Sequence, residues 1–112
     1  MDKEGTAVNK VGQAKEKDFD EIMPRDGFCD MPEETQKIVV DLCREAYKQH
    51  YSGEFKYYKG MACFIKEQLD KQLKPSWHII VGTNFGSFAT YETQSIYLFW
   101  LEHIGFLVWK HG

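Results

Sequence analysis

The stretch PSWHIIVGTNFGSFATYETQSIYLFWLEHIGFLVWK, residues 75–110, decides the fold because it contains four predicted strands, which begin where the period of the apolar residues changes to two. A first strand is predicted at 77–81, where apolar residues alternate across two faces. A second strand is predicted at 85–90. The segments 95–101 and 106–110 are almost continuously apolar, which is typical of strands that are buried on both faces.

Two amphipathic helices are predicted upstream of these strands. The first is expected at 32–50, with Asp30 and Glu33 spaced as a capping box at its start. The second is expected to begin near Tyr57 and to end before Pro75, because the residue before a proline avoids the helical region. One side of this second helix is charged and is predicted to face solvent: Lys66, Glu67, Asp70, Lys71 and Lys74.

The N-terminal part of the chain divides into two segments. Residues 1–18 are polar without a sustained period, which predicts a mobile tail. Residues 19–29 contain apolar side chains around a proline and a glycine, which predicts a short edge strand. The 112 residues therefore predict one domain, at 19–112, behind a tail.

The predicted order of elements indicates an α+β fold. Two helices would pack on an antiparallel β-sheet of about five strands, and two helices cannot cover both faces of such a sheet. The uncovered face would expose large apolar side chains, and patches of that size usually mark an interface. Self-association is the simplest way to cover such a face, so a two-fold dimer is expected.

Composition argues against several classes of function. The net charge is −3, which is opposite to the basic footprint of a nucleic-acid-binding protein. No apolar stretch approaches the length of a membrane-spanning helix, so no membrane insertion is expected. Cys29, Cys43 and Cys63 fit no zinc pattern and are interpreted as buried helical thiols in a reducing cytoplasm. No nucleophile–base pair is visible, so an enzyme is not predicted. The cysteines and histidines show no metal-ligand spacing, so neither a metal nor another cofactor is predicted.

The residues 77–93, WHIIVGTNFGSFATYET, resemble the signature of the type 1 cytoplasmic dynein light chains. The segments 30–34 and 108–112 also resemble the start of that family's first helix and its last strand. The resemblance covers about residues 19–112 and leaves the tail outside.

The resemblance implies a non-catalytic, dimeric dynein subunit. In this family the strand at 85–90 crosses over to pair with the sheet of the other protomer. An extended client segment then adds to the second edge of that strand, in a groove beside the second helix. Dynein intermediate chain and many unrelated proteins are the implied clients, at the microtubule cytoskeleton in the cytoplasm or in a cilium.

Site residues follow from the family motif and from the period of the strands. Those expected to bind peptide are Tyr58, Lys59, Thr83, Asn84, Phe85, Gly86, Ser87, Phe88, Ala89, Thr90, Tyr91, Ile96, Leu98 and Trp100. Those expected at the dimer interface are Trp77, His78, Phe85, Ser87, Phe88, Ala89 and Thr90. Histidine titrates near pH 6.5, so protonation of His78 is a hypothetical switch that would favour monomers at acid pH.

Several positions depart from the family pattern. Tyr58 replaces a usual acidic residue, Thr83 a usual arginine and Tyr91 a usual histidine. Lys59 is interpreted either as a client-binding residue or as a solvated lysine. The connection at 51–57 is about five residues longer than the family norm, and either adds aromatic contacts or is a tolerated insertion. A motor-independent adaptor and a lineage-specific axonemal dynein subunit remain alternative functions.

Overall fold

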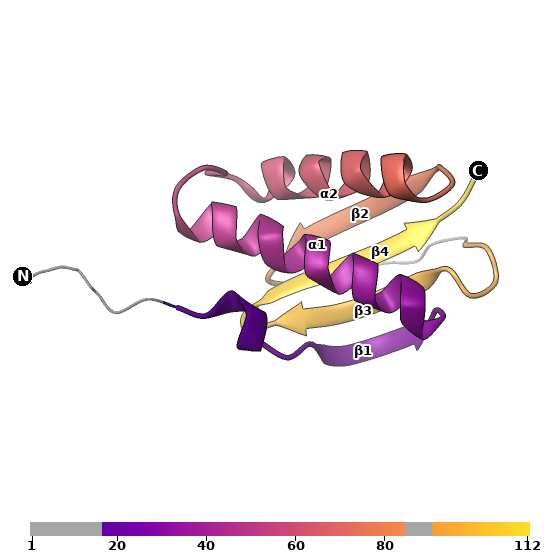
Figure 1. The fold of residues 1–112 in the computed structure, drawn as a ribbon, viewed down its shortest axis with the longest axis horizontal. Coiled ribbons are helices and arrows are strands. Elements are labelled where there is room, and N and C mark those ends of the chain that lie inside the picture. Colours follow the sequence, from indigo (N-terminus) through magenta and orange to yellow (C-terminus); the bar gives the residue numbers. More distant parts are fainter. Residues whose placement is uncertain (1–16, 85–90) are drawn as a thin grey trace, which may run out of the picture.

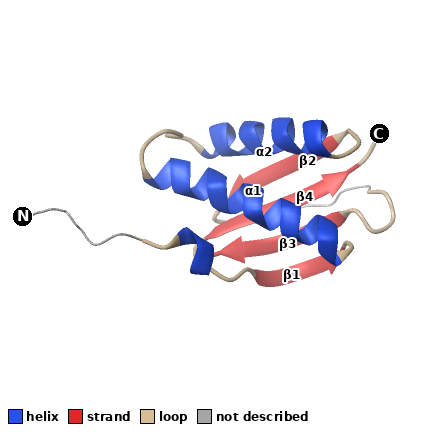
Figure 2. Ribbon diagram, in the orientation of Figure 1, coloured by secondary structure: helices blue, strands red, loops and turns tan. Residues whose placement is uncertain are grey.

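The computed structural model describes residues 17–84 and 91–112. In chain order these residues form η1 (Phe19–Glu21), β1 (Arg25–Asp30), α1 (Glu33–Tyr51), α2 (Tyr58–Gln72), β2 (Trp77–Gly82), β3 (Ile96–Leu101) and β4 (Ile104–Lys110). The strands form one sheet in the order β1-β3-β4-β2, and all neighbouring strands are antiparallel. Both helices cross the same face of this sheet (Figures 1 and 2). The predicted α+β architecture is therefore confirmed.

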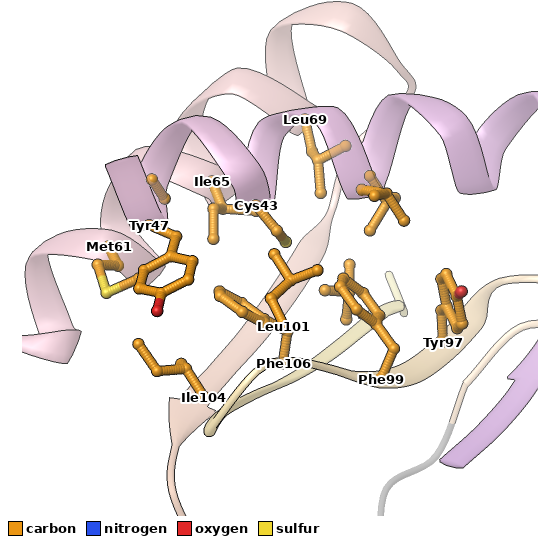
Figure 3. Close-up of a cluster of buried hydrophobic side chains, with 14 of the residues drawn as sticks. Cys43, Tyr47, Met61, Ile65, Leu69, Tyr97, Phe99, Leu101, Ile104 and Phe106 are labelled. Carbon is orange, nitrogen blue, oxygen red and sulfur yellow. The ribbon is translucent and has the colours of Figure 1, made fainter. Parts of the chain in front are cut away.

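The core lies between the helices and this face of the sheet. Aromatic and aliphatic side chains from β3 and β4 point up toward the helices, and α1 and α2 contribute the opposite layer (Figure 3). Phe99 packs on Tyr97, with ring centroids 4.4 Å apart, and on Phe106, at 5.5 Å. The fully buried helical side chains in this layer are Val39, Cys43, Ala46, Met61, Ile65 and Leu69. The apolar stripes of the two helices therefore face the sheet as their periodicity predicts.

A tight hairpin joins β3 to β4. Leu101 pairs with Ile104, so Glu102 and His103 form a two-residue loop, and Glu102 has a φ of 58°. Gly105 is the second residue of β4, and a Cβ at this position would lie only 2.5 Å from the indole of Trp100. Glycine therefore lets the Trp100 ring lie against the backbone of β4 on the face away from the helices.

The start of α1 corrects one prediction. Pro32 is the N-cap, and no side chain bonds to the first helical amides. Asp30 instead accepts a hydrogen bond from the backbone N–H of Gln94, at 3.2 Å. The predicted capping box is wrong because β1 carries Asp30 to the loop before β3, where its carboxylate finds a different donor.

The segment at 19–29 is only partly a strand. Residues Phe19–Glu21 form the short helical turn η1, whose N-cap Asp18 accepts from the N–H of Asp20. Phe19 packs its ring edge-on against Tyr47, with centroids 5.1 Å apart, so this end of the segment belongs to the core under α1. The strand itself begins at Arg25, directly after Pro24. The predicted strand at 85–90 lies outside the described residues. The residues that are described form a sheet of four strands.

Candidate functional site

The first position of β2 is bound by two side chains of α2. The backbone N–H of Trp77 donates to Asp70 Oδ1 at 2.9 Å, and its carbonyl accepts from Lys66 Nζ at 2.8 Å. Both backbone groups of Trp77 therefore point away from β4 and toward α2. The side chain of Trp77 is only 3% exposed and packs in the core of its own protomer.

The direction of these two groups fixes the direction of the rest of β2. The N–H and C=O of one residue in an antiparallel strand point to the same side, and successive residues alternate. Because β2 pairs with β4 in unbroken register from Trp77 to Gly82, the groups of His78 and Ile80 point toward β4. Those of Ile79 and Val81 point outward. Within the described part of the chain, no partner binds these four outward backbone groups, which we call the β2 edge.

A second surface is the face of the sheet that the helices leave uncovered. Side chains alternate across a strand, so this face carries His78 and Ile80 from β2, whereas Ile79 and Val81 pack on the core cluster. His78 stacks on Trp109 with centroids 5.4 Å apart, and its Nε2 donates to the carbonyl of His111 at 2.9 Å. The predicted floor of the groove lies on the same face: Ile96, Leu98 and Trp100.

Residues of β1 contact the side chains that β3 places on this open face. Gly27 lies against Leu98, because a Cβ at Gly27 would come within 3.1 Å of its side chain. The guanidinium of Arg25 lies 5.6 Å from the centroid of the Trp100 ring, within reach of a cation–π contact. Phe28 opposes Leu98 across the β1–β3 pair and remains 50% exposed. The open face therefore carries mainly apolar side chains, with Arg25 beside Trp100 and His78 beside Trp109.

The start of α2 lies near the far end of the β2 edge. Its N-cap, Tyr57, makes no side-chain hydrogen bond, and no acidic residue occupies the first turn. Lys59 is exposed and borders a hollow of about 580 Å³ that is also lined by Phe55, Tyr57 and Cys63. The ring of Tyr58 packs on His50 instead, with centroids 5.4 Å apart. The first amides of α2 therefore have no side-chain cap, and the Gly60 N–H bonds to the carbonyl of Tyr57 at 3.0 Å.

The remaining predicted site residues divide into two groups. Thr83, Asn84 and Tyr91 are exposed and flank the segment that the structure leaves undescribed. The others lie within that segment, outside the described residues: Phe85, Gly86, Ser87, Phe88, Ala89 and Thr90.

The sequence reasoning missed the roles of Lys66 and Asp70. The sequence pattern predicts them on the solvent side of α2, but their head groups bind the backbone of β2 and each other, with 2.9 Å between Nζ and Oδ2. The hydrogen bond from Lys66 lowers the pKa of the Asp70 carboxyl, and the Trp77 N–H acts in the same direction. The spacing of four residues was the available signal, since it places both side chains on one helix face.

The cysteines are distributed differently from the prediction. Cys43 is buried in α1, but Cys29 is exposed on β1 and Cys63 is exposed on α2, so neither is a buried helical thiol. Among the residues described, no three His, Cys, Asp or Glu side chains gather closely enough to hold a metal ion. None of the described helices combines the length and the apolar character needed to cross a membrane.

Comparison with known proteins identifies a matching family and solved structures with a similar fold. The family model for dynein light chain type 1 matches residues 25–111. The dynein light chain-like domain of the Fasciola hepatica calcium binding protein FhCaBP2 shares the fold, with a TM-score of 0.66 and 19% identity. That alignment covers 88% of this chain and all of that domain. A mercury derivative of the same domain aligns with a TM-score of 0.68 and 16% identity, over 80% of this chain and 92% of that one. The chain belongs to the dynein light chain type 1 family, whose members are generally non-catalytic.

Proposed function

We propose that this chain forms a two-fold dimer that holds short extended segments of other proteins. The segment 85–90 of each protomer would pair with the β2 edge of its partner. Client segments, among them one from dynein intermediate chain, would add along the second edge of that strand. Proteins of this family generally bind dynein and peptide clients as dimers, which supports both parts of the proposal.

The β2 edge is the observation that carries the proposal. It presents the outward N–H and C=O groups of Ile79 and Val81 on a strand that is regular at all six positions. Unpaired backbone groups on a straight apolar strand form a template for another strand. Strand addition obtains affinity from main-chain hydrogen bonds and selectivity from the pockets that receive alternate side chains.

The start of α2 supplies the polar end of the proposed client site. Free helix amides there attract an acceptor, and Lys59 adds a positive charge. Two such sites on one dimer would hold two client chains together, and the second contact would form at high effective concentration. The role that follows is that of a dynein-associated subunit that promotes the pairing of its clients in the cytoplasm.

Replacement of Ile79 by proline tests the β2 edge directly. The N–H of Ile79 points outward, so proline removes an edge donor without removing a bond to β4. Ile79→Ala is the matched control, because it loses the same partly buried side chain but keeps the N–H. Sedimentation should show the dimer weakened at least about tenfold more by proline than by alanine. Equal dimer dissociation constants for the two variants would refute pairing at this edge.

A peptide array on the wild-type dimer tests client binding separately. Extended segments of dynein intermediate chain should bind. Their binding should raise the protection of the amides of residues 85–90 against hydrogen exchange. Failure of every extended peptide, with the dimer intact, would leave a purely structural dimer. A pull-down that retains other clients but loses dynein intermediate chain would instead support a motor-independent adaptor.

A further inference from the structure

The β2 edge ends abruptly at Trp77. By the alternation along the strand, three residues direct backbone groups outward: Trp77, Ile79 and Val81. Only at Trp77 are both groups already bound, by Asp70 at the N–H and by Lys66 at the carbonyl. Since Lys66 also binds Asp70, the two side chains form one connected unit over the first position of the strand.

Helix stability alone does not account for this pair. An ion pair at i and i+4 stabilises a helix best when the acidic residue comes first, and here the lysine precedes the aspartate. The side chains also remain partly exposed, at 45% for Lys66 and 27% for Asp70, so their mutual attraction is weakened by solvent. Besides each other, both side chains bind the backbone of Trp77, at 2.8 Å from Lys66 Nζ and 2.9 Å from Asp70 Oδ1.

The alternation of apolar side chains does not by itself fix the register in which another strand pairs with β2. A shift of one residue would turn apolar side chains to the wrong face, so burial rejects it. A shift of two residues keeps every side chain on its correct face. If all three outward positions of β2 were open, a strand could pair with Trp77 and Ile79 as readily as with Ile79 and Val81.

We infer that Lys66 and Asp70 act as a register stop for the strand that adds to β2. By occupying the N–H and C=O of Trp77, they leave Ile79 and Val81 as the only outward hydrogen-bonding positions of this described strand. The added strand must then pair in one register and end before Trp77. These two are positioning residues, and their role rests on the strand addition proposed above.

Amide hydrogen exchange of the full-length protein, followed by NMR, tests this role. The test variant is Lys66→Met with Asp70→Ala. Its matched control is Lys71→Met with Glu67→Ala, which removes the same charges from exposed positions of α2 that make no hydrogen bond to β2 among the described residues. Each protein is measured at concentrations below and above its dimer dissociation constant, and Lys66→Met alone is included in case the double variant does not fold.

In the wild type and the control, the Trp77 amide should be protected at every concentration. Ile79 and Val81 should become protected only in the dimer, each with a single resonance. In the test variant below the dissociation constant, Trp77 should exchange at least about tenfold faster, as expected for loss of a hydrogen bond to a charged group. Its dimer should show doubled resonances at Ile79 and Val81, from two registers. In Lys66→Met alone the Trp77 amide should stay protected while some doubling appears.

Two results would overturn the inference in different ways. A dimer of the test variant with single, unshifted Ile79 and Val81 resonances would show that register is set elsewhere. Wild-type Ile79 and Val81 amides that exchange rapidly at every concentration would refute strand addition itself. The second result is distinguishable because the Trp77 amide would still be protected by Asp70 within the protomer.

Discussion

β1 and β2, the two edge strands of the described sheet, carry the same backbone N–H and C=O groups but differ in how regularly those groups are arranged. β2 pairs with β4 at six consecutive positions without interruption, and its outward groups lie beside α2. β1 begins directly after Pro24 and pairs with β3 through a bulge between Asp26 and Phe28. Bulges, prolines and charges are the devices that keep an edge strand from pairing with other chains. The comparison shows a regular edge at β2 and an edge at β1 that carries a bulge and a preceding proline.

The open face between the two edges should show the largest effect. Leu98 lies in the middle of this face, on β3, and its replacement by glutamate places a charge where a client side chain would pack. Burial of an unpaired carboxylate costs several kcal/mol, so client affinity should fall by more than about 100-fold. Fluorescence anisotropy of a labelled client peptide measures this, with Leu98→Met as the control. Unchanged affinity would show that the client does not contact this face near β3.

Deletion of Gly27 should make the hydrogen-bonding register of β1 as regular as that of β2. Gly27 is the extra residue of the bulge, so its removal joins Asp26 and Phe28 in one continuous register with β3. In a background of Ile79→Pro, which closes the β2 edge, the straightened β1 should promote self-association at about tenfold lower concentration. Sedimentation measures this, and deletion of Gly53 in the exposed interhelical loop is the control. Association that does not change would mean that charge alone protects β1.

A hydrogen bond from the central strand holds β1 in place. Tyr97 donates its hydroxyl to Asp26 Oδ1 at 2.6 Å. Tyr97→Phe should lower the free energy of unfolding by about 1 kcal/mol, the usual net value of a hydrogen bond, because the Asp26 carboxylate is exposed to solvent. Urea denaturation measures the loss, and exchange at the β1 amides should rise more than at the β2 amides. Equal changes at both edges would argue against a local tie.

The same tyrosine gives this edge a dependence on alkaline pH. Burial and the hydrogen bond to Asp26 raise the pKa of Tyr97 well above its ordinary value near 10. The contribution to stability is therefore complete below about pH 10 and is lost as the pH rises toward the raised pKa. Wild-type stability should fall above pH 10, and part of that fall should disappear in Tyr97→Phe. Parallel curves for the two proteins would contradict this assignment.

The acidic character of β1 should have the smallest effect, measured at Cys29. Partial burial and the neighbouring Asp26 and Asp30 raise the pKa of the Cys29 thiol. Asp26→Asn should lower that pKa and increase the rate of iodoacetamide labelling at pH 8 by about twofold to fivefold. Cys63 on α2 serves as the internal reference in the same protein. An unchanged ratio of the two rates would mean that Asp26 does not influence the thiol.

The sequence was most informative where pattern is local. The period of two at 77–81 and the apolar stripes of the two helices predicted the elements and the α+β class, and the motif at 77–93 predicted the family. It was least informative at 19–24, where Phe19 is apolar because it packs under α1 and not because it belongs to a strand. Local composition does not distinguish these two reasons for burial.

The predictions of a capping box at Asp30 and of a solvated charged face on α2 were wrong for a related reason. Asp30 and Glu33 had the correct spacing, but Asp30 binds the distant Gln94 amide. Lys66 and Asp70 had the composition of a solvated face, yet they bind Trp77. In both cases a polar side chain had several candidate partners, and the packing of distant segments selected among them.

The sequence by itself therefore determined which segments are helix and strand, which faces are apolar and which family the chain resembles. These properties depend on side chains a few residues apart, and such spacing can be read directly. Only the tertiary structure decided which backbone groups of β2 remain outward and unpaired, and that Trp77 is closed by α2. Every residue except proline carries the same N–H and C=O, so no amino-acid pattern records which of them another segment will bind.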